Sequence, residues 1–97
     1  MSVYLIYDVD ITDPDTYARY KPEAGRSIIA HGGEILVASD KAETIEGSWA
    51  PSWLVVIRFP SREQAQTWMD SEDYRPWKKL RQTASTAQAV LAVERGG

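Results

Sequence analysis

The chain has 97 residues, a formal net charge of −3 and no cysteine. This length fits one domain over residues 1–97, and the lack of cysteine excludes disulfides and thiol catalysis. The mixed charge, with no prominent block of lysine or arginine, argues against a nucleic-acid partner. The single histidine with carboxylates is a poor ligand set for zinc, so we expect no metal and no cofactor.

Residues 3–11 predict a strand and not a targeting signal. The apolar run stops at Asp8, and no basic region precedes it as it would in a signal peptide. No segment of the sequence has the length and apolar character to span a bilayer. We therefore expect a cytoplasmic protein without a membrane partner.

A helix follows the first strand. Asp13 can cap its start, and Pro14 suits the first helical position. Residues at helical spacing continue to Gly32 and Gly33, and Gly32 suits a left-handed cap that ends the helix. A second strand is expected over residues 34–39, followed by a loop or a short extra strand over 40–47.

The segment Trp53–Phe59 is the most informative part of the chain. It is short and β-branched, and Pro51 and Pro60 bracket it, so it predicts a strand. Its side chains alternate between two faces that are both largely apolar. Helices in so short a chain can cover only one face, so the other face needs cover from outside. A second copy of the chain is the simplest cover, and we expect a homodimer.

Two short helices and a last strand complete the chain. Residues 61–64 form a capping box that starts the first of these helices. After a break near Ser71, we expect the second to start at a cap on Asp73, and residues 87–94 predict the final strand. The order β-α-β-β-α-β predicts a ferredoxin-like α+β fold. Its four-stranded antiparallel sheet would have its first and third strands central and parallel.

Parallel pairing of these two central strands would bring Asp8 beside Arg58 on the strand face that also carries Ile6 and Val56. A carboxylate and a guanidinium at the edge of an apolar cavity can hold a polar ligand group or shift a pKa. The alternative, which we favour, is an ion pair that serves strand register or the dimer contact.

His31 is the only histidine and a candidate general base. It also lies in the last turn of the first predicted helix, where a partly positive side chain meets the negative end of the helix dipole. We favour this structural role over a base and over a haem ligand.

Aromatic and basic residues on the predicted helices and turns offer further candidates. Tyr17, Tyr20 and Tyr74 lie on apolar helix faces, where a tyrosine usually packs in the core with one satisfied hydroxyl. If a pocket lies between sheet and helices, their hydroxyls are its natural polar points. Trp49, held on a turn, either gates a cavity or simply packs. Arg81 is either a surface cation, the reading we favour, or an anchor for an anion.

Short motifs in a fixed order link the chain to a known family. They are Asp13-Pro14 with Tyr17 and Tyr20, His31-Gly32-Gly33, Glu46-Gly47-Ser48-Trp49-Ala50-Pro51, Phe59-Pro60-Ser61, and Ser71-Glu72-Asp73-Tyr74 with Arg81. Because these motifs occur in this order and at this spacing, the chain resembles a member of the family called Domain of Unknown Function 1330. Trp53 departs from the family pattern, which has a polar or basic residue there, and could narrow a pocket or extend an interface.

That family resembles the dimeric α+β barrel superfamily, in which two sheets pack face to face across a two-fold axis. Members of the superfamily include small monooxygenases, muconolactone isomerase-like enzymes and haem-containing proteins. The resemblance implies a dimer and a cavity, but it does not imply one chemistry, because sites are grafted onto folds.

Three hypotheses for the function remain. The first is a homodimer that binds a small, partly apolar molecule through Tyr20, His31, Trp49, Arg58 and Tyr74. The second is a cofactor-independent enzyme of the monooxygenase or isomerase type, with His31 or Asp8 as base and Arg58 or Arg81 stabilising an oxyanion. The third is a purely structural dimer. A cavity that touches His31 or Asp8 would favour the enzyme, and one lined by tyrosines and tryptophans would favour binding.

Overall fold

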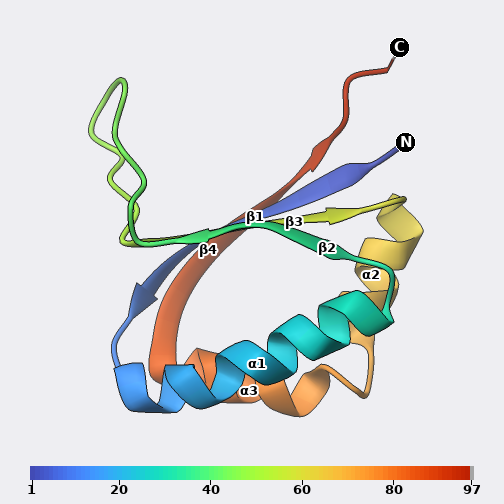
Figure 1. The fold of residues 1–97 in the computed structure, drawn as a ribbon, viewed down its shortest axis with the longest axis horizontal. Helices are drawn as coiled ribbons and strands as arrows, with labels where there is room; N and C mark the ends of the chain where they lie inside the picture. Colours follow the sequence, from blue (N-terminus) through green and yellow to red (C-terminus); the bar gives the residue numbers. More distant parts are fainter. Residues whose placement is uncertain (97) are drawn as a thin grey trace.

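The computed structural model describes residues 1–96, in which a four-stranded antiparallel sheet carries three helices on one of its faces (Figure 1). The elements are β1 (Val3–Ile11), α1 (Pro14–Ala30), β2 (Glu34–Ser39), β3 (Trp53–Phe59), α2 (Arg62–Asp70), α3 (Arg75–Ala84) and β4 (Ser85–Val93). The strand order across the sheet is β2-β3-β1-β4. Within residues 1–96, no helix is long and apolar enough to cross a membrane.

The starts of α1 and α2 follow the predicted capping chemistry. The Asp13 carboxylate accepts a hydrogen bond from the backbone N–H of Thr16, and the side chain of Ser61 accepts one from the N–H of Gln64. These bonds satisfy N–H groups that have no partner inside the helix. After α1, Gly32 takes a φ of +83°, the left-handed conformation expected there.

Two predicted boundaries are wrong. The N-cap of α3 is Tyr74 and not Asp73, because the hydroxyl of Ser71 accepts a hydrogen bond from the Tyr74 N–H and forms the preceding turn. Strand β4 begins at Ser85, two residues before the predicted start, because Ser85 already pairs with Ile11 on β1.

The predicted parallel pairing of the central strands is also wrong. β1 and β3 are antiparallel, with Tyr4 opposite Arg58 and Asp8 opposite Leu54. The crossover through α1 brings β2 back parallel to β1, and the following connection reverses the chain before β3. Asp8 and Arg58 therefore lie four positions apart along the strands, which is roughly 13 Å. The predicted pair of Asp8 with Arg58 does not form.

The core lies between the sheet and the helices, on the strand face that carries Leu5, Val9 and Ile57. Trp68 is 1 % exposed and stacks between Phe59 and Tyr74, with ring centroids 5.7 and 4.2 Å away. Its indole N–H donates to the hydroxyl of Ser27 on α1 at 3.0 Å. The other buried apolar side chains are those of Val3, Leu5, Val9, Tyr17, Tyr20, Ala24, Ile28, Ile57, Ala65 and Ala84.

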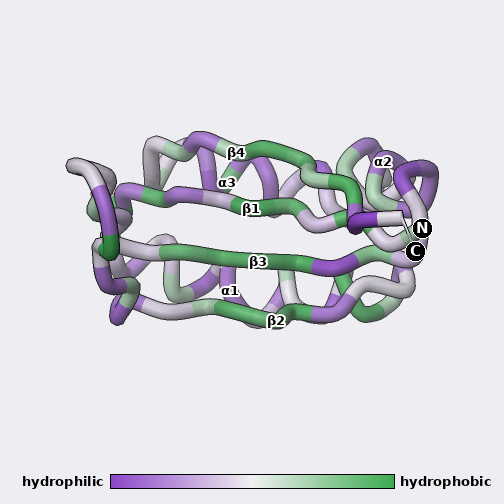
Figure 2. Tube along the Cα trace, turned by 90° about the horizontal axis from the view of Figure 1, so that it is seen from above, coloured by the Kyte–Doolittle hydropathy of each residue, from purple (hydrophilic) through white to green (hydrophobic). Residues whose placement is uncertain are grey.

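The opposite side of the sheet, here called the open face, carries no helix (Figure 1). Hydrophobic residues occupy the middle of all four strands in the view onto this side (Figure 2). Those on the open face include Ile6 at the centre, paired with both Val56 and Val90, and Val90 is 61 % exposed. The full set by strand register is Tyr4, Ile6, Asp8, Asp10, Glu34, Val37, Ser39, Leu54, Val56, Arg58, Thr86, Gln88, Val90 and Ala92.

The connection between β2 and β3 forms an arm, residues 40–52, that rises from the sheet on the side away from the helices (Figure 1). It contains no strand, which decides between the two predicted alternatives. The arm is joined to the open face by Trp49, whose indole N–H donates to the Asp8 carboxylate at 2.8 Å.

Candidate functional site

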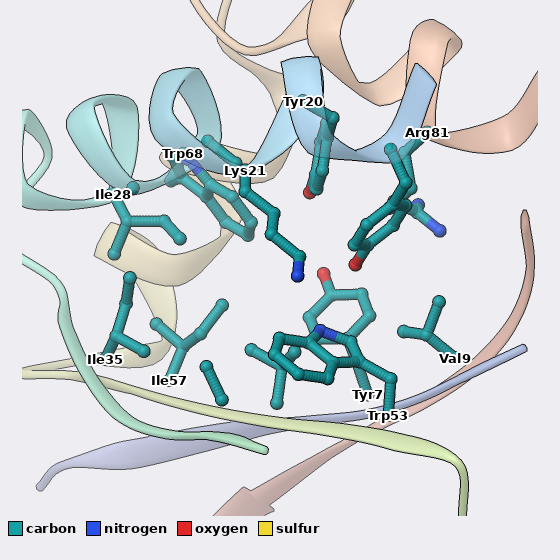
Figure 3. A pocket seen from close by; sticks show the side chains of 15 residues that line it. Tyr7, Val9, Tyr20, Lys21, Ile28, Ile35, Trp53, Ile57, Trp68 and Arg81 are labelled. Atoms are coloured by element: carbon teal, nitrogen blue, oxygen red, sulfur yellow. The ribbon is translucent and has the colours of Figure 1, made fainter. Parts of the chain in front are cut away.

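A cavity of about 120 Å³ lies between the sheet and α1 (Figure 3). The strands form its floor, α1 forms its roof, and one residue each from α2 and α3 closes it. It is lined by Tyr7, Val9, Ile35, Ala38, Trp53, Val55 and Ile57 from the strands, by Tyr17, Tyr20, Lys21, Ala24, Gly25 and Ile28 from α1, and by Trp68 and Arg81.

The spacing of residues on α1 explains why they line one space. Tyr17, Lys21, Ala24 and Ile28 follow one another at intervals of four, three and four, which places them on one side of a helix. Ala24 and its neighbour Gly25 are too small to fill the gap beneath the helix. The cavity therefore forms where the large side chains of the sheet meet the small ones of α1.

Three tyrosine hydroxyls give the cavity hydrogen-bonding groups. Burial raises the pKa of Tyr17 to about 12, and it raises the pKa values of Tyr7 and Tyr20 as well. All three phenols are therefore neutral at pH 7 and able to donate. Behind the cavity, the hydroxyls of Tyr20 and Tyr74 share a buried hydrogen bond of 2.7 Å, which fixes the Tyr20 ring.

Two cations complete the lining. The ammonium of Lys21 lies 4.0 Å from the centre of the Trp53 ring and 5.7 Å from that of Tyr17, within the range of a cation–π contact. Arg81 is only 9 % exposed, and its guanidinium carbon lies 5.6 Å from the centre of the Tyr7 ring. The expectation that Arg81 is a surface cation is therefore wrong.

The structure brings only some of the candidate residues together. Tyr17, Tyr20 and Arg81 line the cavity, and Tyr74 supports Tyr20 from outside it. Trp53, the departure from the family pattern, also lines it and narrows it.

The other candidates lie outside this cavity. The ring Nδ1 of His31 donates to the Ser27 carbonyl oxygen at 2.8 Å, at the end of α1. Arg58 donates from Nε to the Ser2 hydroxyl and lies 3.5 Å from the Glu34 carboxylate. Asp8 and Trp49 contact each other on the open face. None of these four side chains faces the space that Tyr20 and Arg81 enclose.

Sequence reasoning did not single out Tyr7 and Lys21 as site residues. Tyr7 shares one face of its strand with Leu5 and Val9 by alternation, but its hydroxyl was not considered. Lys21 follows Tyr17 by four residues, so its place on the same side of the helix could have been found. Within residues 1–96, no three histidine, aspartate or glutamate side chains gather to hold a metal ion.

The raised phenol pKa values predict a loss of stability at alkaline pH. An unfolded tyrosine ionises near pH 10, whereas the pKa of Tyr17 in the fold is about 12. Above about pH 10 the unfolded chain binds fewer protons than the folded one, so the free energy of unfolding falls as pH rises toward 12. We expect Tyr17→Phe to lessen this fall in urea unfolding between about pH 9 and 11. An unchanged slope would contradict this assignment.

Solved structures share this fold over nearly the whole chain. The chain is similar to a protein of unknown function from Rhodopseudomonas palustris, with a TM-score of 0.82 and 15% identity over 99% of this chain and 84% of that one. It is also similar to SnoaB, a cofactor-independent oxygenase from Streptomyces nogalater, with a TM-score of 0.74 and 10% identity over 99% and 95% of the two chains. A third similar structure is that of a protein from Nitrosomonas europaea provisionally assigned as an antibiotic biosynthesis monooxygenase. Its TM-score is 0.60, with 14% identity over 99% of this chain and 88% of that one.

These likenesses define the class by fold alone, since the identities are low. The chain shares with them an α+β fold, with a four-stranded antiparallel sheet and three helices in residues 1–96. It belongs to the family of the domain of unknown function DUF1330, whose model matches residues 2–95. The predicted family is thereby confirmed. A search of the curated proteins finds no match.

Proposed function

We propose that the protein is a homodimer that binds a small, largely apolar molecule in the cavity between the sheet and α1. The observation that carries this proposal is the cavity, whose walls are aromatic and aliphatic with a few converging polar groups, the usual character of a ligand site. An apolar cavity of about 150 Å³ in another protein holds benzene. A cavity of about 120 Å³ thus suits an occupant of about one ring.

The open face supports the homodimer. Its central residues Ile6, Val56 and Val90 form a patch of neighbouring apolar side chains on adjacent strands. Apolar area of this kind is stabilised by removal from water, and a second copy of the same sheet offers a matching surface. The arm rises from the same side of the sheet and would reach alongside the partner (Figure 1).

Native mass spectrometry combined with a cavity-blocking variant tests the proposal. We expect a dimer, and we expect single-ring probes such as benzyl alcohol or benzoate to shift the NMR signals of residues that line the cavity. Ala38→Phe places a ring into the cavity and should abolish these shifts, because Ala38 is a lining residue. Ala42→Phe adds the same bulk on the arm, outside the cavity, and should preserve them. A monomer would overturn the dimer, and a lack of shifts with both probes would overturn the site.

A second candidate is a cofactor-independent oxygenase that acts on the bound molecule. The fold similarity to the Streptomyces nogalater oxygenase favours it, together with Arg81, the one proposed oxyanion-stabilising residue that lines the cavity. Binding takes precedence because His31 and Asp8, the candidate bases, lie outside that space. Oxygen uptake with hydroquinone that Arg81→Gln abolishes and His31→Ala preserves would support the oxygenase, and no uptake would leave binding as the function.

A further inference from the structure

We infer that the occupant of the cavity is an anion, a single-ring molecule with one ionised oxygen group that pairs with Arg81. This inference rests on the proposed binding function and adds the chemical class of the ligand. It follows from the balance of charge and hydrogen bonding inside the cavity.

Arg81 is a buried cation without a counterion. Its side chain is 9 % exposed, and its Nε is buried with no hydrogen-bond partner among residues 1–96. None of the salt bridges in the same residues includes it. Burying a guanidinium costs free energy unless a charge and acceptors compensate it. The contact with the Tyr7 ring offsets part of this cost but leaves the Nε–H unbonded.

The rest of the lining adds positive charge and supplies no negative charge. Lys21 is a second cation, and the lining contains no aspartate or glutamate. This composition contrasts with the whole chain, whose formal net charge is −3. The acidic residues of the chain therefore lie outside the cavity, and the ionisable groups that line it are two cations and three neutral phenols.

The groups are arranged with an apolar end and a polar end. Ile28, Ile35 and Ile57 lie together at one end of the view in Figure 3. The ammonium of Lys21 and the hydroxyl of Tyr7 lie near the middle, and Arg81 lies at the end opposite the isoleucines. A ring would pack against the isoleucines and extend its acidic oxygen toward the cations. An ionised oxygen accepts hydrogen bonds from guanidinium and phenol groups, and such charge-assisted bonds are the strong ones.

Benzoate and benzyl alcohol form a matched pair of probes, because each is one ring with a single-carbon polar substituent and only benzoate is charged at pH 7. We expect benzoate to bind the unmodified protein at least about tenfold more tightly in calorimetric titration, as one charge-assisted hydrogen bond allows. Benzoate should also shift the NMR signal of the Arg81 Nε–H by more than benzyl alcohol does, because only benzoate forms the charge-assisted hydrogen bond.

Two variants on α3 test whether Arg81 causes the tighter binding of benzoate. Arg81→Gln should reduce the ratio of the two affinities to about one, whereas Lys79→Gln on the exposed side of the same helix should preserve it. A ratio that Arg81→Gln leaves unchanged would overturn the role of Arg81. If Arg81→Gln does not fold, the Nε–H signal of the unmodified protein tests the pairing instead. A shift with benzoate that is no larger than the shift with benzyl alcohol overturns the pairing.

The two affinities distinguish a wrong charge for the ligand from a wrong binding function. Equal affinity for benzoate and benzyl alcohol would overturn the anion and leave the binding function standing. Absence of binding by both probes would overturn the anion and the binding function together.

Discussion

Replacing Trp68 with alanine is expected to lower the free energy of unfolding by about 3–5 kcal/mol. The Trp68 side chain is 1 % exposed and lies between the rings of Phe59 and Tyr74, so its removal leaves a void that the rigid neighbours cannot close. The substitution also leaves the Ser27 hydroxyl without the indole donor. Because this one side chain joins α2 to α1, to β3 and to the N-cap residue of α3, its loss should weaken the whole helical layer.

Urea unfolding at a fixed protein concentration measures the effect, since the stability of a dimer depends on concentration. Trp68→Phe keeps a ring and removes the N–H, so it should cost less than alanine and separates packing from hydrogen bonding. Ile29→Ala is the control, because this large apolar side chain is 68 % exposed on α1, away from the open face, and its removal should cost about 1 kcal/mol or less. A loss below about 1.5 kcal/mol for Trp68→Ala would contradict the central place of this residue in the core.

Replacing Val56 with aspartate is expected to convert the proposed dimer to a monomer at micromolar concentration. Val56 lies at the centre of the open face, paired with Ile6 on one side and Val37 on the other. A carboxylate at this place would be buried against the partner without a counterion, which costs several kcal/mol. The expected loss of dimer affinity is therefore at least about a hundredfold.

Light scattering on a size-exclusion column checks this result over a range of concentrations. Ile29→Asp is the matched control, because it exchanges the same kinds of side chain at a 68 % exposed position on α1, away from the open face. We expect this variant to remain a dimer. A stable dimer of Val56→Asp with the mass of two chains would refute the assembly through the open face.

The sequence predicted the faces of the strands better than their direction. Alternation along Val3–Ile11 and Trp53–Phe59 depends only on the two-residue period of a strand, so the residues that share a face were grouped correctly. The period is the same whichever way a neighbouring strand runs. Alternation therefore could not reveal that the central strands are antiparallel, and the predicted proximity of Asp8 and Arg58 failed with the direction.

The site was predictable where helical spacing alone defines a side of a helix. Core packing was favoured for Tyr17, Tyr20 and Tyr74, with their hydroxyls as polar points if a pocket lay between sheet and helices. Tyr17 and Tyr20 line such a cavity and Tyr74 does not. Arg81 follows Leu80, and spacing allowed either residue to face inward. Which one is buried depends on how α3 packs against α1 and Tyr7, and that is a property of the tertiary structure.

The placement of the cavity on the helix side of the sheet has a consequence for stoichiometry. Consecutive residues of β1 face opposite ways, so Tyr7 lines the cavity while Ile6 and Asp8 face the other side. In a dimer joined through the open faces, each chain therefore keeps a complete cavity of its own, separated from the other by two sheets. Saturation should require two ligand molecules per dimer, and the binding isotherm should be hyperbolic, with the first molecule leaving the affinity for the second unchanged.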